Sequence, residues 1–217
     1  MKNNKTMNKK GLIISSAICL LPIAMSAAVY SRLPEQVATH WGANGLPNGY
    51  MPRFWAAFAL PVLMLGVNLM LWIVLDSDPK RKNTPPVVIN LSKWIVPAMS
   101  VAVQGFVLYN AVAQPLDPTV AVTLFVGATF AVIGNYLPKC KQNYTVGIKL
   151  PWTLHDEENW NKTHRLAGWL WMVGGILVMA SAFFRTQWLM TAIMVTIVLV
   201  PMGYSWWLYR NSTKESK

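Results

Sequence analysis

Long apolar runs separated by short polar segments predict most of this chain's fold. Six runs of about 20 residues contain no Asp, Glu, Lys, Arg or His, and about 20 residues of α-helix span a hydrocarbon core. Lipid offers no hydrogen-bond partners, so each run is expected to satisfy its own backbone as a helix. The runs cover approximately residues 11–30, 54–75, 94–113, 119–137, 166–184 and 186–208. We therefore predict an all-α integral membrane protein with six transmembrane helices.

Composition supports the same class of protein. Hydrophobic residues make up 54% of the chain and charged residues 12%, whereas soluble domains carry about 25% charged residues. Disorder is excluded because a disordered chain needs low hydrophobicity. The basic N-terminus before the first run could belong to a signal peptide, but the length of the run favours a retained helix.

The distribution of basic residues predicts the orientation. Sixteen of the 19 Lys and Arg residues fall in the two termini, the second–third loop and the fourth–fifth loop. The opposite side holds only Arg32, Arg53 and Arg185. Because cytoplasmic loops are enriched in Lys and Arg, both termini are predicted to be cytoplasmic. The net charge of +11 is then a topology signal, and we expect no direct binding of nucleic acid.

Two long loops divide the chain into halves. The N-terminal half, residues 1–113, carries an extracytoplasmic loop at 31–53, and the C-terminal half, residues 114–217, carries a cytoplasmic loop at 138–165. Both loops begin near Leu-Pro, at Leu33-Pro34 and Leu137-Pro138. An inverted repeat would produce this pattern, although Pro commonly ends helices in unrelated segments.

The extracytoplasmic loop reads as a hairpin-like cap on the bundle. Val37–Trp41 has strand character, and Asn44-Gly45 and Asn48-Gly49 are strong turn dipeptides. One interpretation is a packed turn with interfacial aromatic residues, and the other is a ligand-binding loop. The candidate residues are His40, Trp41, Gly45, Pro47, Gly49 and Tyr50.

The cytoplasmic loop leads into the fifth helix. Thr153 or Asp156 can cap a helix whose first turn is acidic. Beyond it, Trp160, His164 and Gly168 fall four residues apart, on one helix face. We therefore predict that this helix begins in the cytoplasm, before its apolar run.

The same loop gathers positive charge beside aromatic residues. Such a surface suits a protein partner or lipid phosphates, while the alternative is ordinary anchoring of basic and aromatic residues at the membrane surface. The ordered mixture of turn-forming and aromatic residues favours a specific role. The candidate residues are Asn135, Lys139, Asn143, Gly147, Lys149, Pro151, Trp152, Thr153, Trp160, His164 and Arg165.

These two loops also carry a family resemblance. The inner block, made of residues 134–139, 143–154, 160 and 163–168, resembles the signature of the SdpI family of bacterial membrane immunity proteins. The outer block, residues 33–34 and 40–50, resembles an extracytoplasmic domain of unknown function found in longer members. Lys149 stands where an arginine is common, which preserves charge but loses bidentate geometry.

The resemblance implies a location and a function. It implies a multi-pass protein of the bacterial cytoplasmic membrane that confers resistance to a secreted, membrane-active toxin peptide. It implies less strongly that the protein signals to a cytoplasmic transcriptional repressor. The expected partners are the lipid bilayer, a toxin peptide and that repressor, and we expect no cofactor and no enzymatic activity.

Two other functional classes stay open. A transporter or exporter of a small amphipathic solute is compatible with the runs, which offer only uncharged polar groups for pairing between helices: Asn68, Gln104, Asn110 and Asn135. A metal-dependent enzyme would use the acidic and histidine side chains of 155–164, but their spacing matches no standard zinc motif and favours a capped helix start. Asp76 and Asp78 are expected to be solvated in the second–third loop.

Overall fold

The computed structural model describes residues 8–42, 45–113, 117–184 and 187–215. Six of its helices are long and apolar enough to cross a membrane, as predicted. They are α1 (Lys9–Val29), α2 (Arg53–Ser77), α3 (Pro86–Val112), α4 (Pro118–Tyr136), α6 (Glu157–Ser181) and α7 (Gln187–Glu215). Short elements join them: η1 (Tyr30–Arg32), β1 (Gln36–Trp41), β2 (Pro47–Pro52), η2 (Arg81–Asn83), η3 (Leu137–Lys139), α5 (Pro151–His155) and η4 (Ala182–Phe184). The chain is a multi-pass membrane protein.

The chain divides into two compact units. Unit 1 contains residues 1–77 and 89–116, and unit 2 contains residues 78–88 and 117–217. The linker between α2 and α3 therefore belongs with the second unit. We describe each unit by itself.

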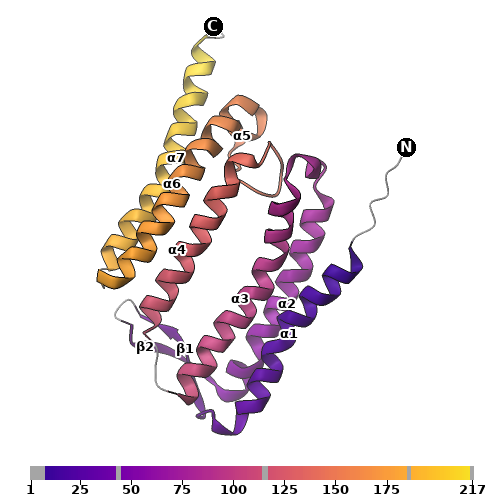
Figure 1. Ribbon diagram of the computed structural model, residues 1–217, viewed down its shortest axis with the longest axis vertical. Helices are drawn as coiled ribbons and strands as arrows, with labels where there is room; N and C mark the ends of the chain where they lie inside the picture. Colours follow the sequence, from indigo (N-terminus) through magenta and orange to yellow (C-terminus); the bar gives the residue numbers. More distant parts are fainter. Residues whose placement is uncertain (1–7, 43–44, 114–116, 185–186, 216–217) are drawn as a thin grey trace. The chain divides into compact units, whose positions relative to one another are not determined.

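Unit 1 consists of α1, α2 and α3 with the β-hairpin at one end (Figure 1). Polar side chains join its helices inside the apolar bundle. Gln104 Nε2 donates to Ser26 Oγ at 3.1 Å and to the Ala56 carbonyl at 2.9 Å. Asn68 Nδ2 donates to Ser15 Oγ at 3.1 Å. The predicted interhelical pairing is confirmed for Asn68 and Gln104, whereas it is wrong for Asn110, whose Nδ2 donates to the Phe106 carbonyl of its own helix at 3.0 Å.

The predicted hairpin is also confirmed, and it packs onto this bundle. β1 and β2 are antiparallel, with Val37 opposite Met51. Val37 is buried in a cluster with Leu33 and with four residues of α2 and α3: Ala56, Ala57, Val107 and Leu108. The expected turn at Asn48-Gly49 is wrong, because both residues lie inside β2. A Cβ on Gly49 would lie 2.9 Å from His40 Cβ, so strand pairing explains the glycine there.

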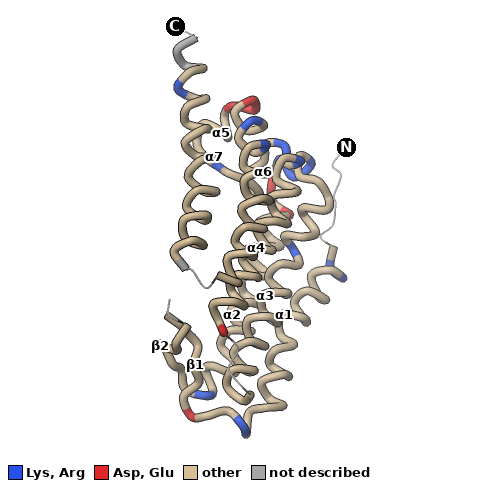
Figure 2. The backbone as a smooth tube through the Cα atoms, turned by 60° about the vertical axis from the view of Figure 1, so that its left-hand side comes forward, with Lys and Arg blue, Asp and Glu red and all other residues tan. Residues whose placement is uncertain are grey.

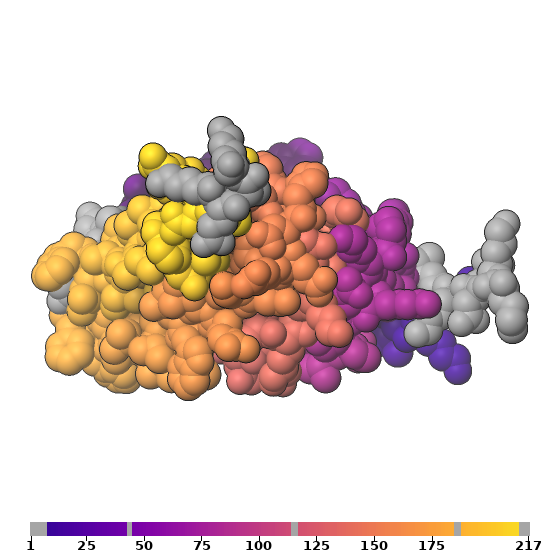
Figure 3. Space-filling view, turned by 90° about the horizontal axis from the view of Figure 1, so that it is seen from above, coloured from indigo at the N-terminus to yellow at the C-terminus, as the bar shows by residue number. Residues whose placement is uncertain are grey.

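Unit 2 consists of α4, α6 and α7, with α5 beside the start of α6 (Figure 1). Small residues let α4 and α6 approach closely. A Cβ on Gly134 would lie 2.8 Å from the Gly168 carbonyl, and one on Gly127 would lie 2.6 Å from the Gly175 carbonyl. In the view from above, the residues of α5 and α6 (orange) lie against α7 (yellow) (Figure 3). The charged residues of this unit lie mainly at the end where α5 and α6 begin (Figure 2).

Two helices, α3 and α6, begin before the apolar runs that mark them in the sequence. The predicted early start of α6 is confirmed: Asp156 is the N-cap, and its Oδ1 accepts from the backbone nitrogens of Glu158 and Asn159. α3 begins at Pro86, well before the apolar run that predicted it. Lys93 therefore lies within a helix and is buried, whereas the sequence suggested a loop cation.

Candidate functional site

The segment between η3 and α6 folds around a buried asparagine. Asn143 is fully buried, and its Nδ2 donates to the carbonyls of Lys141 and Val146, at 2.9 and 3.0 Å. Its Oδ1 accepts from the backbone nitrogens of Thr145 and Val146, at 2.9 and 2.7 Å. This side chain holds the turn that residues 141–146 make.

Gly147, Trp160 and His164 lock this loop to α6. The rings of Trp160 and His164 stack with centroids 4.0 Å apart, and both residues are buried. Ile148 N donates to His164 Nε2 at 3.0 Å, so Nδ1 carries the ring hydrogen and donates to the Trp160 carbonyl at 2.8 Å. Gly147 has a φ of 128°, and a Cβ there would lie 2.4 Å from His164 Nε2. Both the backbone angle and the close approach require glycine.

A second polar network joins α5, α6 and α7. Trp152 Nε1 donates to Ser205 Oγ at 2.9 Å, and Ser205 Oγ donates to Asn159 Oδ1 at 2.7 Å. Asn159 Nδ2 donates to the Ser205 carbonyl at 2.9 Å. The Trp152 ring also stacks on Tyr209 with centroids 5.6 Å apart. Trp152 is thus positioned by Ser205 and Asn159, which the sequence did not single out.

Thr153 connects the two halves of the loop. Its Oγ1 accepts from Leu150 N at 2.9 Å and donates to the Ile148 carbonyl at 2.9 Å. The Thr153 carbonyl accepts from Gln142 Nε2 at 2.9 Å. Thr153 lies inside α5, and the cap of α6 is Asp156.

The α2–α3 linker binds to this loop, and the expectation that Asp78 is solvated is wrong. Asp78 is 8% exposed, and its Oδ2 accepts from Tyr144 N at 3.1 Å and Thr145 Oγ1 at 2.7 Å. Asn83 Nδ2 donates to the Gln142 carbonyl at 2.7 Å, and Lys141 N donates to the Asn83 carbonyl at 3.0 Å. Linker and loop form one structure.

The candidate residues of the inner loop therefore fall into two groups. Asn143, Gly147, Trp152, Thr153, Trp160 and His164 make the internal contacts described above. The others are exposed: Asn135, Lys139, Lys149, Pro151 and Arg165. Tyr144, one of the aromatic residues beside the positive charge of this loop, is 48% exposed next to Lys149. Within the inner loop, the exposed candidates and Tyr144 are accessible to a partner, and Trp152 is partly exposed.

The extracytoplasmic candidates lie in the hairpin, and their side chains do not converge. Trp41 packs edge-on against Phe106 with centroids 5.2 Å apart. His40 Nδ1 bonds Asn48 Oδ1 on the surface, and Pro47 and Tyr50 are exposed. Gly45 has a φ of 75°, which suits the predicted turn, although Asn44 lies outside the described residues. The structure supports a packed hairpin with an exposed aromatic residue.

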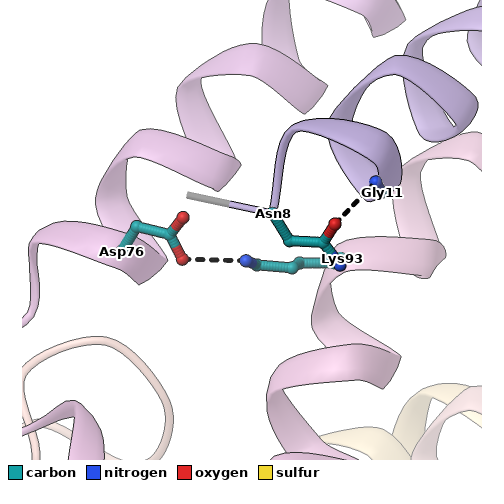
Figure 4. Close-up of polar contacts among 4 residues, drawn as sticks. All are labelled: Asn8, Gly11, Asp76 and Lys93. Carbon is teal, nitrogen blue, oxygen red and sulfur yellow. Dashed lines mark hydrogen bonds and ion pairs between the residues drawn. The ribbon is translucent and has the colours of Figure 1, made fainter. Parts of the chain in front are cut away.

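Unit 1 contains an ion pair that the sequence did not predict (Figure 4). Lys93 Nζ lies 2.8 Å from Asp76 Oδ1, and the two side chains are 6% and 14% exposed. The same ammonium lies 3.7 Å from the centroid of the Trp72 ring. The expectation that Asp76 is solvated is therefore wrong, and the membrane helices contain a charged pair near one end.

The described residues offer little conventional chemistry. No three His, Cys, Asp or Glu side chains within them gather closely enough to hold a metal ion. His155 Nδ1 contacts the Pro151 carbonyl. Cys140 is buried, and burial raises the pKa of its thiol from 9.0 to about 11, which suppresses its reactivity.

Comparison with known proteins matches both loops. Residues 139–205 match the SdpI/YfhL protein family, and residues 17–65 match a domain of unknown function, DUF1648. The chain is 25% identical over 193 residues to a protein of Bacillus subtilis (strain 168) named Immunity protein SdpI. The resemblance to the SdpI family is confirmed. The match to the Bacillus subtilis SdpI protein covers 89% of this chain and 91% of that protein. No solved structure matches the chain.

Proposed function

We propose that this chain is an immunity protein of the bacterial cytoplasmic membrane, protecting the cell against a secreted, membrane-active toxin peptide. The observation that carries the proposal is the match to Immunity protein SdpI, which extends over nearly the whole of both chains. Six membrane-spanning helices support it. With both termini cytoplasmic, the hairpin faces the toxin and the loop at 138–165 faces the cytoplasm.

Signalling to a cytoplasmic repressor would require two conformations with different affinities for the toxin. The inner loop is the element that could report such a change. The hydrogen bonds that join it to α6, α7 and the α2–α3 linker would transmit movement of the helices to exposed residues such as Arg165 and Pro151.

Survival curves test protection directly. The protein is expressed in a toxin-sensitive bacterium, and an Sdp-type toxin peptide is titrated against wild type, Arg165→Ala and Lys162→Ala. Lys162 is the matched control because it is an exposed cation on the same helix and is paired with Glu158.

Protection by wild type and Lys162→Ala but not by Arg165→Ala, at equal membrane abundance, supports both the function and the site. Equal protection by all three removes Arg165 from the mechanism. No protection by any of them contradicts immunity to that toxin.

Transport of a small amphipathic solute is the second candidate, and one observation favours it. The pair between Lys93 and Asp76 places ionisable groups among the membrane helices, where such groups often mark transport pathways. Uptake or efflux in proteoliposomes, measured with wild type and Lys93→Met, separates transport from immunity.

A further inference from the structure

Two lysines converge on one exposed tyrosine at the surface of unit 2. Lys80 Nζ lies 5.1 Å from the centroid of the Tyr144 ring and donates to Gln142 Oε1 at 2.6 Å. Lys149 Nζ donates to the carbonyls of Tyr144 and Thr145, at 3.3 and 3.1 Å. We call Lys80, Tyr144 and Lys149 the Tyr144 patch.

The acceptors that hold these two ammonium groups are neutral. An amide oxygen and two backbone carbonyls orient the lysines without cancelling their charge, and each ammonium has three hydrogens to donate. The Tyr144 patch therefore holds two positioned cations, Lys80 beside the Tyr144 ring and Lys149 at the Tyr144 backbone.

The nearby carboxylate is directed into the loop. Asp78 is 8% exposed, and its oxygens accept from Lys80 N, Tyr144 N and Thr145 Oγ1. At the start of α6, Glu158 pairs with Lys162 at 2.7 Å and Asp156 caps the helix. Among the described contacts, no carboxylate touches the ammonium of Lys80 or Lys149.

The position of the Tyr144 patch along the chain fixes its depth. α2 ends at Ser77 and α3 begins at Pro86, so the linker that carries Lys80 is a short connection between two membrane-spanning helices. Such a connection lies at the level of the lipid headgroups, where tyrosine is enriched. The anion most abundant at that level is a lipid phosphate.

We propose that the Tyr144 patch binds the phosphate of an anionic phospholipid such as phosphatidylglycerol. The two ammonium groups contact the phosphate oxygens, and the Tyr144 ring lies beside the glycerol backbone. The site exists because the linker and the loop are joined through Asp78 and Asn83. The proposal does not depend on toxin immunity.

Lipid retention tests the proposal. Full-length protein is reconstituted into nanodiscs of phosphatidylcholine and phosphatidylglycerol, extracted in mild detergent, and examined by native mass spectrometry for bound lipid. Wild type is compared with Lys80→Gln/Lys149→Gln and with Lys9→Gln/Lys10→Gln. The second pair is the matched control because it removes the same charge from two exposed lysines at the start of α1.

Wild type and the Lys9/Lys10 control are expected to retain phosphatidylglycerol in preference to phosphatidylcholine. The Lys80/Lys149 variant is expected to lose about fivefold in that preference per lysine removed. Equal retention by the two double variants, or no preference in wild type, overturns the proposal.

Two further arms identify the ligand and control for folding. In the first arm, the nanodiscs contain phosphatidylcholine alone, and inorganic phosphate or poly-glutamate is added. If either probe binds and its binding requires Lys80 and Lys149, the ligand is a soluble anion or an acidic polypeptide, and the proposal of a lipid ligand is overturned. Buried Cys140 must stay unreactive to maleimide in each variant. If the double variant exposes Cys140, the single variant Lys149→Gln replaces it in the comparison and is expected to show the same fivefold loss of preference. Lys149→Arg, which keeps the charge, should retain phosphatidylglycerol as wild type does.

Discussion

Replacing Gly147 with alanine should open the inner loop. A non-glycine residue at a φ of 128° stores roughly 1–3 kcal/mol of backbone strain. The new Cβ would also lie 2.4 Å from His164 Nε2 and 2.9 Å from Trp160 Cη2. It would therefore break the bond from Ile148 N, which contributes about 1 kcal/mol. The two effects together amount to about 2–4 kcal/mol of local destabilisation.

Cys140 supplies the assay for this change. Cys140 is 2% exposed, and its carbonyl accepts from Trp160 Nε1 at 2.8 Å. A cost of about 3 kcal/mol raises the population of the open loop by roughly a hundredfold. In a Cys19→Ala background, maleimide labelling of Cys140 in native membranes should therefore accelerate by about that factor.

The control is Gly203→Ala in α7, where a Cβ would meet nothing within 4 Å. An alanine inside a helix is neutral to slightly stabilising, so labelling should match that of wild type. Full labelling after denaturation calibrates both variants. If Gly147→Ala labels as slowly as Gly203→Ala, the steric and conformational account of the loop is wrong.

Three other predictions follow from the buried groups. Because burial raises the pKa of Cys140 to about 11, its labelling rate should rise about tenfold per pH unit between neutral pH and pH 10, and a plateau below pH 9 would contradict this. Lys93→Met removes the cation that pairs with Asp76 and should lower the free energy of unfolding by about 3–5 kcal/mol. Adding Asp76→Leu should restore most of the thermal stability. A double variant that is no more stable than the single variant would refute the pairing. Ser205→Ala removes the hydroxyl that accepts from Trp152 Nε1 and should lower the free energy of unfolding by about 1–3 kcal/mol. Its melting temperature should be lower than that of the control Ser212→Ala, which alters an exposed serine of the same helix.

The membrane helices could be predicted from the sequence because their signal is local. Each apolar run is long enough to span lipid, and the helix in the structure lies over or around it. The start of α6 was predictable for the same reason: Asp156 caps backbone nitrogens within three residues of itself. The face made by Trp160 and His164 follows from helical spacing alone.

The contacts that assemble the inner loop could not be predicted because their partners lie far apart in the chain. Asp78 meets Tyr144 and Thr145, and no local pattern distinguishes a carboxylate bound in this way from a solvated one. The sequence places Lys93 in a loop because cations usually end apolar runs. Its burial depends on Asp76 and Trp72 of another helix. Likewise, the sequence shows Ser205 only as a polar residue in an apolar run. Its role depends on Trp152 of α5, which donates to its Oγ in the structure.

The attachment of the α2–α3 linker to the inner loop determines where the chain can be cut. A C-terminal fragment starting at residue 117 would contain the whole SdpI-like segment but would lose the groups that bond Tyr144 N, Thr145 Oγ1 and Lys141 N. An N-terminal fragment ending at residue 113 would carry those groups without their partners. Each half should therefore be unstable when expressed alone and should regain stability when the two are produced together. Residues 78–88 of the N-terminal fragment would then bind the inner loop of the C-terminal fragment.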